Sequence, residues 1–325
     1  MKNNLNSTTT TTTTTTNIQS IYKSSNMLSI DLAGIPLRNP LLLASGFLGI
    51  SQQVFNRLYN DGLGAIVSKS ISVSPLEGYK GPTVVYLGEK GYLNAVGLAN
   101  PGSDVFAHEI MNNQIPLVVS IVGSSQSDFQ KLINKFDKLN IVAYEVNLSC
   151  PHVEKMGMEV GDDPDLVTKI IKTIKTRTKK PVIIKVGIGK SDVLKLATII
   201  QESGADAITA INTIKAMAIN VETGMPVLSN KVGGLSGVPL KPIGVRCVYE
   251  IFKKVNIPVI GCGGIFTWED AIEYILAGAT AIELGSVIGY RGLKVFNGIK
   301  LGITRYLQKK DYKNVKEIIG LAHKY

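Results

Sequence analysis

Short apolar runs recur along the chain, and longer stretches with a helical spacing of apolar residues separate them. Nearly continuous apolar runs of this length are typical of parallel strands that are buried on both faces. The stretches 164–178, 192–203 and 268–277 are amphipathic and are predicted to be helices. The alternation favours a parallel sheet covered by helices. The predicted strands are residues 41–44, 65–68, 117–121, 142–147, 182–186, 207–211, 259–261 and 281–284.

One short phrase marks several of the predicted joints between a helix and the next strand. Residues 202–208, ESGADAI, resemble residues 276–282, LAGATAI, and residues 60–66 are a weaker copy. Each glycine falls where a helix should stop, because glycine adopts the left-handed conformation there at little cost. Eight strands with such joints predict a (β/α)8 TIM barrel. A doubly wound sheet is the alternative, but the sequence has no GxGxxG motif at the start of its first predicted helix.

The chain is predicted to hold a single folded domain, residues 27–325. Residues 78–97 suggest a small β-hairpin inserted near the top of the barrel. Residues 1–26 contain an unbroken run of threonine from Thr8 to Thr16 and too few apolar residues to fold. We expect them to be a disordered tail, or the product of an over-long gene start with Met27 as the true initiator.

Composition excludes several classes of protein. Hydrophobic residues make up 45% of the 325 residues and charged residues 18%, which rules out a wholly disordered chain. No apolar run reaches the ~18 residues of a membrane span. The net charge is +10, but the basic residues are scattered, which argues against nucleic-acid binding and favours small anionic ligands.

The three cysteines argue against a metal site and against disulfides. Cys150, Cys247 and Cys262 form no CxxC pair, so no zinc or iron–sulfur motif is present in the sequence. An odd count does not suit a disulfide framework, and we expect a cytoplasmic protein with no bound metal. Cys247 lies in a helical pattern and is predicted to be a core residue, whereas Cys262 is expected to pack beneath a phosphate-binding loop.

Polar residues or glycines follow almost every predicted strand. In a TIM barrel the chemistry lies at the carboxyl ends of the strands, so these residues should meet at one end. Gly263-Gly264 and Gly285-Ser286 follow the last two strands, where a barrel commonly binds phosphate, although tight-turn glycines are an equal alternative. The other strand-end residues are Ser45, Lys69, Ser70, Ser120, Asn147, Lys185, Asn212 and Thr213, and a flexible glycine-rich loop is predicted at 233–237.

Two lysines among these positions and one nearby cysteine carry candidate chemistry. Lys69 and Lys185 lie in apolar surroundings, where a lysine needs an anion or a lowered pKa, and a structural salt bridge is the alternative. Cys150 follows a strand between Ser149 and Pro151, and a thiol in such a polar loop can act as a base or a nucleophile.

The motif Asn147-Leu-Ser-Cys-Pro151 resembles that of the class 1 dihydroorotate dehydrogenases. The resemblance covers about residues 28–307, and residues 161–164, GDDP, are more similar to subclass 1B than to 1A. Several supporting motifs are each weak alone, but their order and spacing together are specific to the family. The supporting motifs are 44–46, 69–70, 94–98, 212–213, 233–237, 263–264 and 285–286.

The resemblance implies an FMN enzyme that oxidises (S)-dihydroorotate to orotate in pyrimidine biosynthesis. Cys150 would be the base that removes the C5 proton while the C6 hydride passes to flavin N5. The implied FMN-binding residues are Ser45, Lys69, Ser70, Ser120, Asn147, Lys185, Ile211, Gly237, Gly263, Gly264, Gly285 and Ser286. The implied substrate-binding residues are Lys69, Asn94, Ala95, Val96, Gly97, Leu98, Asn147, Asn212 and Thr213.

The resemblance also implies partners and leaves two alternatives. Subclass 1B enzymes use a separate subunit that carries FAD and a [2Fe–2S] cluster, so we expect a homodimeric core within a heterotetramer. His152 and Ser120 stand where the family usually has Asn. Ser-Cys-Pro-His also occurs in dihydropyrimidine dehydrogenases, which act on uracil or thymine and are the alternative enzyme. A non-catalytic flavin-binding module is the alternative of another class.

Overall fold

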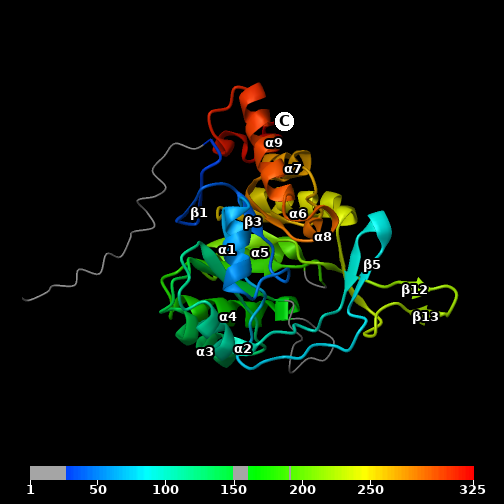
Figure 1. The fold of residues 1–325 in the computed structure, drawn as a ribbon. Coiled ribbons are helices and arrows are strands. Elements are labelled where there is room, and N and C mark those ends of the chain that lie inside the picture. Colours follow the sequence, from blue (N-terminus) through cyan, green and yellow to red (C-terminus); the bar gives the residue numbers. More distant parts are fainter. Residues whose placement is uncertain (1–26, 149–159, 190–191) are drawn as a thin grey trace, which may run out of the picture.

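A closed barrel of parallel strands forms the centre of the molecule (Figure 1). The computed structural model describes residues 27–148, 160–189 and 192–325. The barrel strands follow one another in chain order and close by pairing of the last strand with the first, which confirms the predicted TIM barrel. They are β3 (Leu41–Leu43), β4 (Ala65–Val67), β7 (Leu117–Ile121), β8 (Ala143–Asn147), β9 (Val182–Val186), β10 (Ala207–Ala210), β15 (Val259–Cys262) and β16 (Ala279–Leu284).

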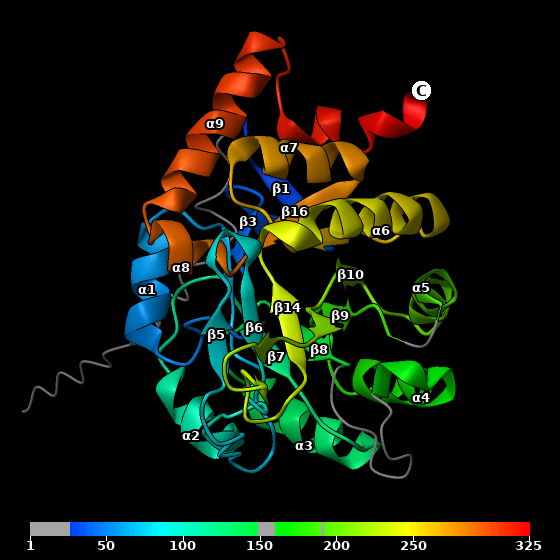
Figure 2. The same cartoon turned by 90° about the vertical axis from the view of Figure 1, so that its right-hand side faces the viewer.

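Helices surround the barrel as an outer ring (Figure 2). Two of them begin with a capping box, in which Ser125 or Thr267 exchanges hydrogen bonds with the aspartate three residues later. The helices are α1 (Gln52–Asn60), α2 (Gly102–Glu109), α3 (Gln126–Phe136), α4 (Pro164–Lys175), α5 (Val193–Glu202), α6 (Lys241–Lys254), α7 (Trp268–Ala277), α8 (Val287–Arg291) and α9 (Val295–Lys309).

The predicted joints between helices and strands are confirmed. Gly62, Gly204 and Gly278 follow α1, α5 and α7 and have φ angles of 119°, 94° and 122°. These positive angles suit glycine and turn the chain into the next strand. Every residue of β7, β8 and β9 is buried, as expected for strands with the barrel interior on one face and helices on the other.

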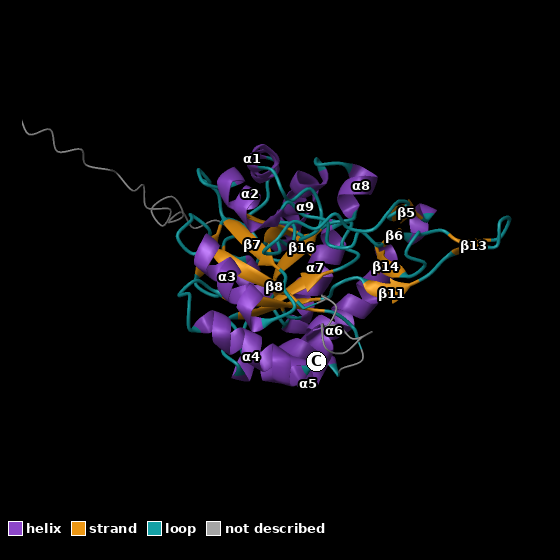
Figure 3. Ribbon diagram, turned by 90° about the horizontal axis from the view of Figure 1, so that it is seen from below, coloured by secondary structure: helices purple, strands orange, loops and turns teal. Residues whose placement is uncertain are grey.

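A second, four-stranded antiparallel sheet stands on the barrel (Figure 3). Its order is β11 (Ile214–Ala216), β14 (Gly233–Ser236), β6 (Tyr92–Asn94), β5 (Val84–Tyr86). β5 and β6 follow β4 in the chain, and β11 and β14 follow β10, so the sheet grows from the loops at the carboxyl ends of the barrel strands. A short hairpin of β12 (Ile219–Asn220) and β13 (Met225–Pro226) extends from it.

This sheet corrects two predictions. The predicted hairpin exists as β5 and β6, but it is half of a larger sheet. The predicted flexible loop at 233–237 is wrong, because residues Gly233–Ser236 form strand β14, which pairs with both β6 and β11. A Cβ added at Gly233 would meet the Asn94 carbonyl oxygen at 2.5 Å, so here glycine permits close strand pairing rather than flexibility.

Aromatic side chains join the second sheet to the barrel. The ring of Tyr290 in α8 lies 5.3 Å from that of Tyr86 and 5.0 Å from that of Tyr92, measured between centroids. Its hydroxyl donates a hydrogen bond of 2.8 Å to the Gly88 carbonyl. These contacts fix the sheet above the end of the barrel where the strands finish.

The remaining elements are short. A hairpin of β1 (Ile30–Leu32) and β2 (Ile35–Leu37) precedes the barrel. In the part of the chain that is described, no helix is both long and apolar enough to cross a membrane. Single 3₁₀ turns are η2 (Gly88–Lys90), η3 (Val160–Asp162), η4 (Val238–Leu240), η5 (Val315–Ile318) and η6 (Leu321–Lys324).

Candidate functional site

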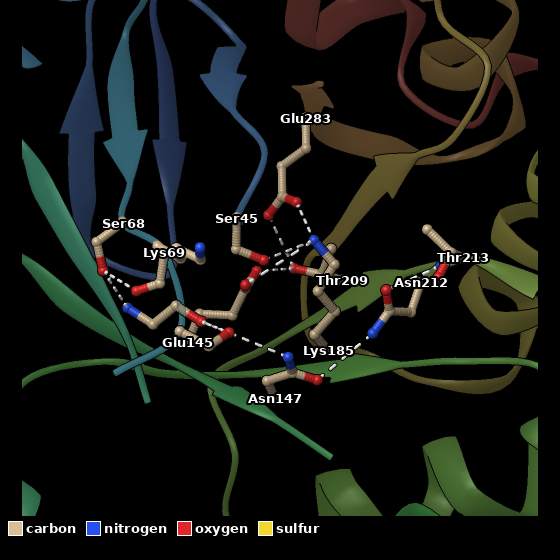
Figure 4. A network of polar contacts seen from close by, with 12 residues as sticks. Ser45, Ser68, Lys69, Glu145, Asn147, Lys185, Thr209, Asn212, Thr213 and Glu283 are labelled. Carbon is tan, nitrogen blue, oxygen red and sulfur yellow. Dashed lines mark hydrogen bonds and ion pairs between the residues drawn. The ribbon is translucent and has the colours of Figure 1, made fainter. Parts of the chain in front are cut away.

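The predicted polar residues meet at the carboxyl end of the barrel (Figure 4). A chain of hydrogen bonds joins residues from four strand ends. The Ser120 and Ser70 hydroxyl oxygens lie 2.9 Å apart, and the Asn147 amide donates to Ser70 at 3.0 Å. The Asn212 amide donates to the Asn147 oxygen at 3.4 Å. Residues far apart in the sequence therefore present hydroxyl and amide groups to one place.

Lys69 follows β4 at the carboxyl end of the barrel. Its side chain is half-buried, and no carboxylate among the described residues forms an ion pair with it. Burial lowers the pKa of its ammonium group because desolvation disfavours the charged form. An anionic ligand bound here would compensate for the hydration that the ammonium group loses on burial. Lys69 is therefore suited to bind a carboxylate or an anionic ring.

Lys185, in β9, is paired, so the salt bridge considered as an alternative is present. Its Nζ lies 2.6 Å from Glu283 Oε2 and 3.9 Å from Glu145 Oε1, and it donates to Ser45 Oγ at 3.2 Å. Burial acts to lower the pKa of Lys185, but the carboxylates of Glu145 and Glu283, with the hydrogen bond to Glu283, raise it above its ordinary value. Lys185 is therefore a permanent cation that also contacts Ser45.

Sequence analysis missed the buried residues below this lysine. Glu145 and Glu283 are 0% and 1% exposed, and Thr209 is 0% exposed. The Thr209 hydroxyl lies 3.1 Å from Glu145 Oε2 and 3.4 Å from Glu283 Oε1. A charged residue inside an otherwise apolar strand was the available signal, because such a residue needs a partner in the core.

The predicted substrate residues of the second sheet approach the same end. The Asn94 amide donates to the Gly234 carbonyl at 3.1 Å. A Cβ added at Gly234 would lie 2.1 Å from Thr213 Oγ1, so Asn94 and Thr213 flank one glycine. Residues 95–98 continue from β6, and the Val96 carbonyl accepts a hydrogen bond of 3.1 Å from the Tyr79 backbone.

The glycines after β15 and β16 differ in their surroundings. Gly264 has a φ of 71°, and a Cβ there would meet the Lys241 nitrogen at 2.6 Å, so the turn itself requires glycine. At Gly263, which has a φ of 117°, and at Gly285 the nearest atoms to an added Cβ are at 3.5 Å and 3.3 Å, so these two positions are less crowded than Gly264. Ser286 follows at the start of α8.

Two further predicted residues can be placed. The Ile211 backbone nitrogen donates to the Cys262 carbonyl at 3.0 Å, which joins the ends of β10 and β15. Gly237 is buried against Gly91. Cys150 and His152 lie outside the described residues. Asn147, the last residue of β8, belongs to the hydrogen-bonded cluster and precedes Cys150 by three positions in the sequence.

A cavity of about 350 Å³ lies elsewhere, lined by Asp137 and residues 175–180. These residues precede β8 and β9, at the amino ends of the strands. No predicted site residue lines it, and we do not assign it to the site.

Comparison with known proteins agrees with the resemblance found in the sequence. Residues 27–307 match the family model described as dihydroorotate dehydrogenase. A protein of Pyrococcus abyssi is 45% identical over 300 residues, which cover 92% of this chain and 100% of that protein. One of Methanocella arvoryzae is 42% identical over 91% of this chain and 98% of its own. One of Archaeoglobus fulgidus is 40% identical over 92% and 99%.

All three relatives carry the name dihydroorotate dehydrogenase B (NAD(+)), catalytic subunit. The family and the subclass predicted from the motifs are thereby confirmed. The two alternatives, a uracil-type enzyme and a non-catalytic flavin module, are not favoured by these relatives.

Proposed function

The chain belongs to the dihydroorotate dehydrogenase family, and we propose on this basis that it oxidises (S)-dihydroorotate to orotate in pyrimidine biosynthesis, with FMN as its bound flavin. The substrate assignment rests on the half-buried Lys69, which has no carboxylate partner among the described residues, and on the amides of Asn147 and Asn212 at the same end of the barrel. A ligand with one carboxylate and an imide matches a site that combines a cation with groups that both donate and accept hydrogen bonds.

The donor set suits FMN. Gly263 and Gly285, at the ends of β15 and β16, lie where a TIM barrel commonly binds phosphate. Lys185 places a positive charge next to Ser45, which suits a ring that becomes more electron-rich. We assign to FMN the residues Ser45, Lys69, Ser70, Ser120, Asn147, Lys185, Ile211, Gly237, Gly263, Gly264, Gly285 and Ser286.

The protein's own residues would bind, orient and deprotonate the substrate. FMN, when bound, supplies the acceptor for the hydride that leaves C6. Cys150 takes the proton from C5, which is acidified by the neighbouring carbonyl. Lys69 holds the carboxylate, and the substrate is also held by Asn94, Ala95, Val96, Gly97, Leu98, Asn147, Asn212 and Thr213.

Substrate choice tests this proposal. Dihydroorotate should bleach the flavin absorbance of the purified protein under anaerobic conditions, whereas dihydrouracil, which lacks the carboxylate, should not. Replacement of Lys69 by Ala should weaken orotate binding about 10- to 100-fold, because a hydrogen bond to a charged group is lost. Orotate affinity is measured by the shift of the flavin spectrum.

Lys131→Ala is the matched control, since Lys131 is an exposed residue of α3, and it should bind orotate as the unchanged protein does. Bleaching by dihydrouracil instead of dihydroorotate would assign the protein to the uracil-type enzymes. A flavin that neither compound reduces would refute the substrate assignment.

We also propose a homodimeric core with a separate electron-transfer subunit that carries FAD and a [2Fe–2S] cluster. The relatives are named as catalytic subunits of NAD(+) enzymes, and this sequence has three cysteines with no CxxC pair. The isolated chain should therefore reduce its flavin with dihydroorotate but give no NADH-linked turnover. Steady NADH formation by the isolated chain would contradict the need for a partner.

A further inference from the structure

Three polar side chains occupy one level of the barrel interior, where branched apolar residues normally pack. Glu145, Thr209 and Glu283 come from β8, β10 and β16, which are alternate strands of the barrel. Alternate strands contribute to the same layer of a TIM barrel. Lys185, from the intervening strand β9, contacts this layer through Glu283 and also contacts Ser45 (Figure 4).

The charges in this cluster do not balance if both carboxyl groups are ionised. Lys185 supplies one positive charge and the two glutamates would supply two negative charges, in a cluster that is at most 3% exposed. An uncompensated buried charge is costly, and such a group takes up a proton instead. Cys262, in β15, is the other described titratable group that acts on the pair, and burial raises the pKa of its thiol to about 12, so it adds no charge at neutral pH.

The hydrogen bonds lead to the same conclusion. Ionised carboxylates only accept, and the cluster offers four carboxylate oxygens. Lys185 donates to Glu283 Oε2, the single Thr209 proton can serve one glutamate at a time, and the buried Glu145 Oε1 has no hydrogen-bond partner among the described residues. A proton between the two carboxyl groups would provide the missing donor. Burial and the neighbouring Glu145 both raise the pKa of Glu283.

We propose that Glu145 and Glu283 share one proton at neutral pH, so that they form with Lys185 an electrically neutral triad beneath the flavin site. The position of the triad next to a flavin rests on the proposed function, whereas the shared proton rests only on the buried side chains. Within that function the two glutamates are positioning residues, because they act through Lys185. A neutral triad leaves the positive end of Lys185 available to the ligand, while a triad with charge −1 would oppose electron gain there.

Infrared spectroscopy of the protein without flavin tests the shared proton. The unchanged protein near neutral pH should show the carbonyl stretch of a buried protonated carboxylic acid, and this band should disappear as the pH is raised. Glu283→Gln and Glu145→Gln should each abolish the band, since the remaining carboxylate is neutralised by Lys185 and stays ionised. Glu202→Gln, an exposed position at the end of α5, should leave the band unchanged.

The alternatives give different results. A band that survives in one of the two variants would show that a single glutamate holds the proton by burial, and the sharing would be refuted. Absence of the band from the unchanged protein would refute the proposal without reference to any variant. Because no flavin is needed, failure here is distinguishable from failure of the proposed function.

The flavin potential provides a second readout. Glu283→Gln keeps the triad neutral under the proposal, so the FMN midpoint potential near neutral pH should match that of the unchanged protein. At higher pH, where the shared proton is lost, the potential of the unchanged protein should fall below that of the variant. If the potential of the variant is already higher at neutral pH, both carboxyl groups are ionised in the unchanged protein and the proposal is overturned. The difference would be ~30 mV for each tenfold change in the ratio of the affinities for oxidised and reduced flavin.

Discussion

Cys150→Ala is expected to slow reduction of the bound flavin by dihydroorotate about 10²- to 10⁴-fold, which is the range for loss of a positioned base. Alanine cannot accept the C5 proton, so the hydride would have to leave from a substrate that keeps this proton. FMN should remain bound, because the residues assigned to it other than Asn147 lie outside β8 and the segment that follows it. Anaerobic stopped-flow absorbance measures the rate, and the flavin spectrum of the purified variant measures occupancy.

The matched control is Cys247→Ala. Cys247 is fully buried in α6, as predicted from the helical pattern, and its loss should lower stability without slowing flavin reduction. A Cys150→Ala protein that reduces its flavin at the original rate would remove Cys150 from the mechanism. Loss of the flavin itself from this variant would instead assign Cys150 a binding role.

The barrel could be predicted because its strands carry a strong local signal. The predicted strands 117–121 and 182–186 coincide with β7 and β9, and the predicted helix 268–277 coincides with α7. In each strand every residue is buried, so the apolar run is unbroken and its ends are sharp. Glycine at the joints adds a backbone signal that does not depend on distant contacts.

The second sheet could not be predicted as fully, because its strands exist through long-range pairing. Gly233–Ser236 has no strand-like composition, and it becomes β14 by pairing with β6, about 140 residues earlier, and with β11. Glycine lowers the local preference for a strand but permits the close approach to Asn94. Local patterns therefore suggested a loop.

The candidate site divides in the same way. Residues that follow strands, such as Asn147 and Asn212, were found because barrel topology brings all strand ends together. Glu145 and Glu283 were missed because each lies within an apolar run that already predicted a strand. Their meeting with Lys185 depends on closure of the barrel between β16 and β3, which no local pattern contains. The residues at the strand ends offer hydrogen-bonding groups to ligands, and the buried glutamates with Lys185 set the charge next to them.

Lys185→Met should destabilise the flavin-free protein by about 3–5 kcal/mol near neutral pH, which is the usual cost of removing one partner from a buried ion pair. Methionine keeps much of the side-chain volume but leaves Glu283 without the cation 2.6 Å away. The free energy of unfolding in urea measures the effect. Lys241→Met is the control, because Lys241 is 30% exposed and pairs with the partly buried Asp270 and the exposed Glu273. Solvent-exposed pairs contribute about 0–1 kcal/mol, so this partly screened pair should lose less than the fully buried one.

The pH dependence of this loss follows from the proton on Glu283. Its pKa in the folded protein is raised by burial and by Glu145, and removal of Lys185 takes away a charge that lowers it. A raised folded-state pKa gives stability that is complete below the unfolded value of ~4.3 and is lost as the pH rises through the folded value. The deficit of Lys185→Met should therefore be small near pH 5 and should grow toward neutral pH.

A second substitution separates charge from packing in this prediction. Adding Glu283→Gln to Lys185→Met removes one of the carboxyl groups left without a cation, so the double variant should be more stable than Lys185→Met at neutral pH and should depend less on pH. If the double variant is as unstable as the single one, the loss comes from packing around residue 185. If Lys185→Met is as stable as Lys241→Met, both glutamates must be neutral in the variant without any cost. The 2.6 Å ion pair between Lys185 and Glu283 argues against that outcome.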